Sequence, residues 1–240
     1  MNKGIGLGRT VTLEWLDATA SLVLENWTPR EIRQELLSII QRSLHGVEMQ
    51  RKTIDVLLAI WVKTANTIPV LHKEALRLYK LATVPEERLW LHYGMTLAYY
   101  PFFRLCVSAI GQLGKSDDII TNKMIKERVA AEMGHLGDLD RSVERLIASL
   151  VYWGIIKRVE QKNKYKPCLR IFHTSITNIE TWLLSCALHA HPAEELPFTD
   201  LLRLPELFPF KFTVTIDHLR QKPCLTIQRQ GSWDMVRLKE

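Results

Sequence analysis

Cysteine is scarce and scattered in this chain, which excludes a disulfide scaffold and a structural zinc site built on paired thiols. The four cysteines, Cys106, Cys168, Cys186 and Cys224, lie far apart and form no CxxC pair. A chain of 240 residues can bury enough apolar surface to fold without cross-links. We therefore expect reduced thiols in a cytoplasmic protein.

Long apolar runs are also missing. The longest uncharged stretch near the middle, Leu89 to Phe103, contains His92 and Pro101 and ends after 15 residues. That is short of the roughly 18–20 residues that a membrane-spanning helix requires. Met1 to Arg9 lacks the apolar stretch of a signal peptide. We expect a buried core helix here and no membrane span.

Catalytic constellations are equally hard to find. Residues 4–8 alternate glycine with Ile and Leu, but a dinucleotide-binding fingerprint needs a preceding strand, so an N-terminal arm is the better interpretation. Cys186, His189 and His191 match no structural zinc spacing and have no obvious fourth ligand. No Ser-His-Asp grouping or P-loop can be proposed from spacing. We predict a protein that is not an enzyme and that holds no cofactor and no metal.

What the sequence does contain, first, is a long helical region. Residues 11–112 carry apolar side chains at helical spacing throughout. A strong start signal has Thr28 as N-cap, Pro29 at the first helical position and Glu31 as the partner of a capping box. Five or six helices fit, and no strand pattern occurs before Ile119. This region is predicted to be a helical bundle.

The most informative segment follows this bundle. It reads as a helix from Thr121 to Met133, a second helix from about Leu139 to Trp153, and two short strands, Ile155–Val159 and Cys168–Phe172, around the loop Gln161–Lys166. That order is typical of a winged helix-turn-helix, which often places its second helix in the DNA major groove. We predict double-stranded DNA as the partner.

Positive charge is densest on the predicted wing. The chain has a net charge of +6 and a pI near 9.2, and residues 157–170 contain Lys157, Arg158, three more lysines and Arg170 against the single acid Glu160. Phosphate contacts would favour this excess. The competing interpretation is a solvated hairpin that lysines keep soluble.

The second helix would add an outward row to this surface. Ala148 is small enough for close approach to a groove, and two arginines could reach phosphates or a guanine edge. Acids at the same end weaken the case, because Glu144 could pair with these arginines. The predicted nucleic-acid-binding residues are Arg141, Ser142, Arg145, Ser149, Tyr152, Lys157, Arg158, Lys162, Lys164 and Lys166.

The last quarter of the chain combines a helix with short strands. Residues 174–190 have helical spacing, and 210–216, 225–229 and 233–238 alternate as strands do. We predict a mainly α protein with three parts: a helical bundle (1–112), a winged helix-turn-helix (113–173), and a C-terminal helix with a small antiparallel sheet (174–240).

Several aromatic segments, in this order and spacing, resemble the BrxA family, the small helical component of bacterial BREX phage-defence systems. The segments are Leu13-Glu14-Trp15-Leu16, Trp27-Thr28, Tyr99-Tyr100-Pro101-Phe102-Phe103, Leu150-Val151-Tyr152-Trp153-Gly154-Ile155-Ile156, Leu196-Pro197-Phe198 and Leu207-Phe208-Pro209-Phe210. The resemblance implies a DNA-binding accessory protein without enzymatic activity, a NusB-like bundle, and other defence-system proteins as partners.

Two other functions stay open at this point. One is an interaction scaffold, in which the winged helix binds protein instead of nucleic acid. The other is a transcriptional regulator with a ligand-sensing helical domain. The sequence does not decide between DNA and RNA, and it gives neither a site preference nor an oligomeric state.

Overall fold

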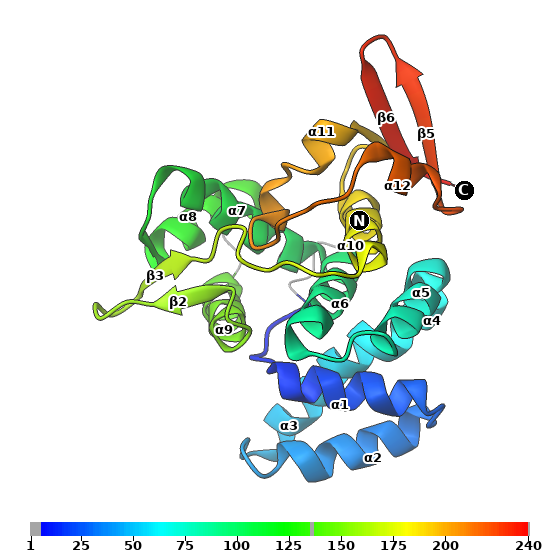
Figure 1. Ribbon diagram of the computed structural model, residues 1–240. Helices are drawn as coiled ribbons and strands as arrows, with labels where there is room; N and C mark the ends of the chain where they lie inside the picture. Colours follow the sequence, from blue (N-terminus) through cyan, green and yellow to red (C-terminus); the bar gives the residue numbers. More distant parts are fainter. Residues whose placement is uncertain (1–5, 135–136, 240) are drawn as a thin grey trace.

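The computed structural model describes residues 6–134 and 137–239. The protein is mainly helical with two small antiparallel sheets, as predicted (Figure 1). The first half is helical throughout and ends with a helix that reaches into the next part of the chain. Its elements are α1 (Leu13–Leu24), α2 (Pro29–Ile40), α3 (Val47–Leu58), the π-helix η1 (Ala59–Lys63), α4 (Thr64–Thr67), α5 (Pro69–Tyr79), α6 (Pro85–Tyr99) and α7 (Pro101–Ser116).

Local signals define where these helices begin. The Thr28 hydroxyl caps α2, and Glu31 returns the hydrogen bond to the Thr28 backbone, so the predicted capping box is confirmed. Proline stands at the start of α2, α5, α6 and α7, where its missing N–H costs no hydrogen bond. These signals act within a few residues, which is why sequence alone finds them.

The middle part contains two helices and a three-stranded sheet. It comprises β1 (Ile120–Thr121), α8 (Asn122–Met133), α9 (Leu139–Tyr152), β2 (Ile156–Arg158) and β3 (Lys164–Pro167). The strand order is β1-β3-β2, with both pairings antiparallel. Helix α7 packs against α8 and against the sheet. The helices were predicted correctly within two residues at each end.

The second strand of the hairpin lies elsewhere than predicted. Strand β3 falls largely in the segment that sequence analysis left as a loop, and not at Cys168–Phe172. Asn163 adopts a left-handed backbone (φ 60°) and makes a tighter turn possible. Arg170 is also left-handed (φ 51°), and from there the chain leaves the hairpin: the Phe172 N–H donates to the Pro209 carbonyl at 3.1 Å.

The C-terminal part folds back over the first helices. Its longest helix, α10, packs against α6 and α5, and a second sheet has the order β4-β6-β5. The elements are α10 (Thr177–Ala190), β4 (Glu195–Pro197), α11 (Phe198–Leu201), the short 3₁₀ helix η2 (Pro205–Leu207), α12 (Ile216–Arg220), β5 (Leu225–Gln230) and β6 (Trp233–Leu238). The strands predicted at 225–229 and 233–238 are confirmed.

The predicted strand at 210–216 is wrong. Phe210 and Phe212 do alternate inward, with ring centroids 4.4 Å and 5.5 Å from Trp90 on α6. The segment pairs with no neighbouring strand beyond one bridge, Phe172 to Phe210, among the described residues. The buried Glu180 side chain instead holds it, accepting hydrogen bonds from the Thr213 N–H (2.7 Å), the Thr213 hydroxyl (2.8 Å) and the Val214 N–H (3.0 Å).

One apolar core runs through all three parts of the chain. Gly111 permits the closest approach, because a Cβ there would lie 2.0 Å from the Pro205 carbonyl oxygen. The helices and sheets are therefore packed together and not strung out as separate bodies. Within residues 6–134 and 137–239, no helix has both the length and the apolar character needed to cross a bilayer.

Replacing Glu180 with alanine should lower the free energy of unfolding by about 3 kcal/mol, because the N–H groups of Thr213 and of the buried Val214 lose their acceptor. Urea denaturation followed by tryptophan fluorescence measures this loss. Glu14 provides the control, since it is exposed and has no ion-pair partner among the described residues, and Glu14→Ala should change stability by less than about 0.5 kcal/mol. Equal losses in the two variants would contradict the anchoring role of Glu180.

Candidate nucleic-acid interface

The β2–β3 hairpin projects from the body of the protein (Figure 1). Lys157, Arg158, Lys162 and Lys166 are exposed on it, and Lys164 is half-buried. None of these five side chains takes part in an ion pair within the described residues. The hairpin thus carries unneutralised positive charge at the place where sequence analysis expected a wing.

The hairpin cations divide between two sides of this part of the fold. Lys157 and Lys166 are direct cross-strand partners and line a hollow that also contains Asp117 and Asp118. A different hollow, beside α8, is lined by Lys162 at the hairpin turn and Lys164 at the start of β3. Its other charged lining residues are Lys123, Lys126, Glu127, Asp140 and Glu144. The two sides meet along the hairpin itself.

The first turn of α8 is tied to the hairpin turn. The Asn122 N–H donates to the Asn163 carbonyl oxygen at 3.1 Å, and Thr121 caps α8 by accepting from the Met124 N–H at 3.2 Å. The cationic hairpin is consequently supported at its turn as well as along its ladder. A held hairpin loses less entropy than a free loop when it binds a partner.

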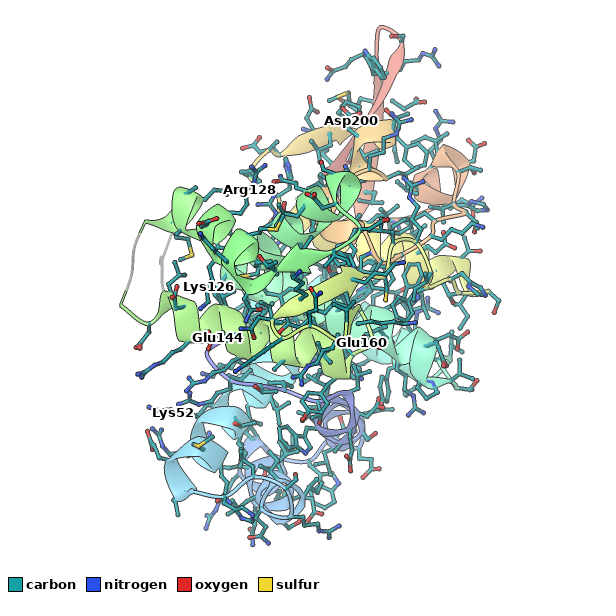
Figure 2. All side chains as sticks on the ribbon, turned by 90° about the vertical axis from the view of Figure 1, so that its left-hand side faces the viewer. Lys52, Lys126, Arg128, Glu144, Glu160 and Asp200 are labelled. Carbon is teal, nitrogen blue, oxygen red and sulfur yellow. The ribbon has the colours of Figure 1, made fainter. Side chains whose placement is uncertain are left out.

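One flank of α9 is electrically neutralised. The Lys126 ammonium group lies 2.7 Å from the Glu144 carboxylate and 3.4 Å from Asp140. Figure 2 shows Lys126 and Glu144 next to each other, with Lys52 on the other side of α9. Glu144 therefore pairs across to α8, and not with Arg141 or Arg145 as considered above.

Two of the predicted contact residues are not on the surface. Ser142 and Ser149 are each only 3% exposed, so the prediction that they flank an outward row is wrong. They lie beneath residues 8–11, which we call the N-terminal strap. The Ser149 hydroxyl accepts from the Val11 N–H at 2.9 Å, and the Trp153 indole N–H donates to the Val11 carbonyl at 2.9 Å.

The strap also turns Arg145 away from solvent. Its guanidinium donates to the Gly8 carbonyl at 2.7 Å and is half-buried, whereas Tyr152 is 65% exposed. Arg141 and Arg145 line a cleft between α9 and the α3–η1 segment, away from the hairpin hollows. The structure therefore places the predicted wing cations on one hairpin, divided between its two sides, and separates them from Arg145.

Sequence reasoning missed the cations that face these arginines across the cleft. They are Lys52 on α3 and Lys63 in η1, whereas Arg9 in the strap lies beside Arg145 on the same side. A basic residue on a solvent-facing helix surface is ordinary, and nothing in the local spacing signals that α3 approaches α9. Of the glycine-rich stretch considered above, Gly4 and Ile5 lie outside the described residues.

The possible metal ligands Cys186, His189 and His191 do not form a site. Cys186 is fully buried in α10, where burial raises the pKa of its thiol well above the usual value. Among the residues that the structure describes, no three His, Cys, Asp or Glu side chains gather as metal ligands.

No family model, no curated protein and no solved structure matches this chain.

Ser149→Ala should destabilise the fold by about 1–3 kcal/mol, because the buried Val11 N–H loses its acceptor. Ser185→Ala is the matched control: Ser185 is equally buried in a helix, but its hydroxyl bonds only to the Thr181 carbonyl of the same helix. Urea unfolding of both variants compares the two losses. If Ser149→Ala costs no more than the control, the strap is not held by this hydroxyl.

Proposed function

We propose that this protein is a DNA-binding accessory protein without enzymatic activity, and that it contacts duplex DNA through a winged helix and its basic wing. The order β1-α8-α9-β2-β3, with the sheet order β1-β3-β2 and α7 packed behind it, supports the winged-helix assignment. The helical region before it remains proposed as a NusB-like bundle.

The observation that carries the proposal is the hairpin. Five cationic side chains stand on a supported, projecting ribbon, and none of them has an ionic partner among the described residues. Unpaired lysines of this kind bind phosphates and release counterions from DNA. A surface that binds an uncharged face of another protein would not require such an excess of positive charge.

The exposed side chains of α9 favour DNA binding with little sequence preference. Its acidic flank is occupied by Lys126 and its two serines are buried, so few side chains remain to read base edges. Arg141 and Tyr152 are the long exposed side chains left on the helix. Phosphate contacts position a protein on DNA without reading its sequence, and Arg141 can make such a contact.

A role in BREX-type phage defence rests on the resemblance of the aromatic segments to the BrxA family. In that role the partners would be double-stranded DNA and other defence-system proteins in the cytoplasm. An interaction scaffold is the alternative. Trp233 supports it, since this side chain is 54% exposed next to the turn of the projecting β5–β6 hairpin (Figure 1).

Replacing Lys157, Lys162 and Lys166 together by glutamine should weaken binding to a short labelled duplex and flatten its salt dependence. Each lost phosphate contact lowers the slope of log Kd against log salt by about 0.9, so the slope should fall by about 2–3. Fluorescence anisotropy across a salt series measures both quantities.

The control triple variant, Lys73→Gln, Lys80→Gln and Lys211→Gln, removes the same charge from exposed lysines away from the hairpin. It should keep the wild-type slope. Equal flattening of the salt dependence in both triple variants would mean that only net charge matters. If the wild-type protein binds no duplex at low salt, the DNA-binding proposal fails and the interaction scaffold is favoured.

A further inference from the structure

A cleft of about 890 Å³ lies between α9, the N-terminal strap and the α3–η1 segment. Cavities of this size are typical of small-molecule sites, and a DNA duplex is too wide to enter one. Five cations and two acids line it, together with two tyrosines. The charged and aromatic lining residues are Arg9, Lys52, Asp55, Lys63, Tyr99, Tyr100, Asp138, Arg141 and Arg145.

Two guanidinium groups converge at the inner edge of this cleft. Arg9 donates to the Gly8 carbonyl oxygen at 2.8 Å, and Arg145 donates to the same oxygen at 2.7 Å. One neutral carbonyl is thus shared by two positive charges. Like charges held this close repel each other unless an anion lies between them.

One of the two acids that line the cleft, Asp55, is already engaged by other cations, whereas Asp138 forms no ion pair within the described residues. Asp55 pairs with Arg33 at 2.6 Å and with Arg51 at 3.3 Å, neither of which lines the cleft. Glu48, beyond the lining, binds Arg51 and Lys52 at 2.9 and 3.0 Å. The five lining cations outnumber the two lining acids, so the cleft keeps a net positive charge.

Four of the cleft cations have no carboxylate within 4 Å among the described residues: Arg9, Lys63, Arg141 and Arg145. The Arg9 Nε atom is buried and has no hydrogen-bond partner there. Burial and the neighbouring Arg145 both lower the pKa of Arg9. Such an arrangement is costly in the empty protein and becomes favourable when an anion supplies acceptors.

The opposite wall of the cleft is anchored in the core through Trp61. Trp61 in η1 is fully buried, and its indole N–H donates to His92 Nδ1 at 3.2 Å. This inward anchor fixes the π-helical turn that carries Lys63 at the cleft wall. π-helical turns inside α-helices are frequent at functional sites.

We propose that this cleft is a binding site for a phosphorylated ligand, whose phosphate oxygens lie between Arg9 and Arg145 and within reach of Arg141 and Lys63. Four cations match the several charges of a phosphate or pyrophosphate group better than the single charge of a carboxylate. The proposal does not rest on duplex binding by the hairpin, because the hairpin lysines do not line this cleft.

Calorimetric titration of the 240-residue chain with inorganic pyrophosphate tests the site. Wild-type protein should bind, and Arg9→Gln should weaken binding at least about tenfold through loss of charge-assisted hydrogen bonds. Within the described residues Arg9 hydrogen-bonds only to the adjacent Gly8 carbonyl, so its replacement removes no long-range hydrogen bond. Lys63→Gln is a second variant on the opposite wall, with the same expected direction.

Arg128→Gln is the matched control, since Arg128 is exposed on α8 and binds Gln112 outside the cleft. It should bind pyrophosphate as the wild-type protein does. The triple glutamine variant of the hairpin should also retain pyrophosphate binding, which separates failure of this site from failure of the duplex-binding proposal. Absence of wild-type binding, or equal binding by Arg9→Gln and Arg128→Gln, overturns the proposal.

Two further titrations identify the source of the phosphate. ATP binding more tightly than pyrophosphate indicates a free nucleotide with its base in the cleft near Tyr99. A short single strand with a 5′-phosphate, binding more tightly than the same strand without it, indicates a strand end. Either result supports the site.

Discussion

The attachment of the N-terminal strap to α9 is the constraint on which the functional surfaces depend. Val11 is held at both of its backbone polar groups: the Ser149 hydroxyl accepts from its N–H, and the Trp153 indole donates to its carbonyl. Gly8 is held by Arg145. The strap lies between α9 and α1, so it fixes how the helix pair and its sheet sit on the first helical group. The strap also covers some side chains of α9 and leaves others exposed to solvent.

This attachment gives α9 two different flanks. One faces α8, where Lys126 neutralises Glu144 and Asp140. The other faces the strap and the cationic cleft, with Arg145 turned inward. The lysines of the hairpin beyond the helix have no ion-pair partner among the residues that the structure describes. Positive charge is thus concentrated in two places with different shapes: a projecting ribbon suited to a duplex backbone and a cleft suited to a small phosphorylated group.

Sequence predicted the features that local interactions determine. The capping box at Thr28 and the two helices α8 and α9 follow from neighbours a few residues apart. The hairpin cations were also found, because they cluster along the chain. The defence role and DNA binding, in contrast, remain proposals.

What sequence missed depends on contacts between distant segments. Ser149 is buried by a strap 138 residues away, so its helical position gave no sign of it. The alternation at Phe210 and Phe212 is real but serves packing on Trp90, while Glu180 takes the hydrogen bonds that a neighbouring strand would have taken. The cleft joins residue 9 with residues 52, 63 and 145, which no motif connects.

A disulfide between strap and helix tests most directly whether the strap stays on α9 while the protein binds DNA. A Cβ at Gly8 would lie 3.5 Å from the Ser142 Oγ atom, which is close enough for Gly8→Cys and Ser142→Cys to cross-link. The measurement is the duplex Kd of the oxidised double variant against its reduced form. We expect the same Kd, because the hairpin is untouched. Binding by the reduced form alone would mean that the strap must leave α9 and that the buried serines meet the DNA.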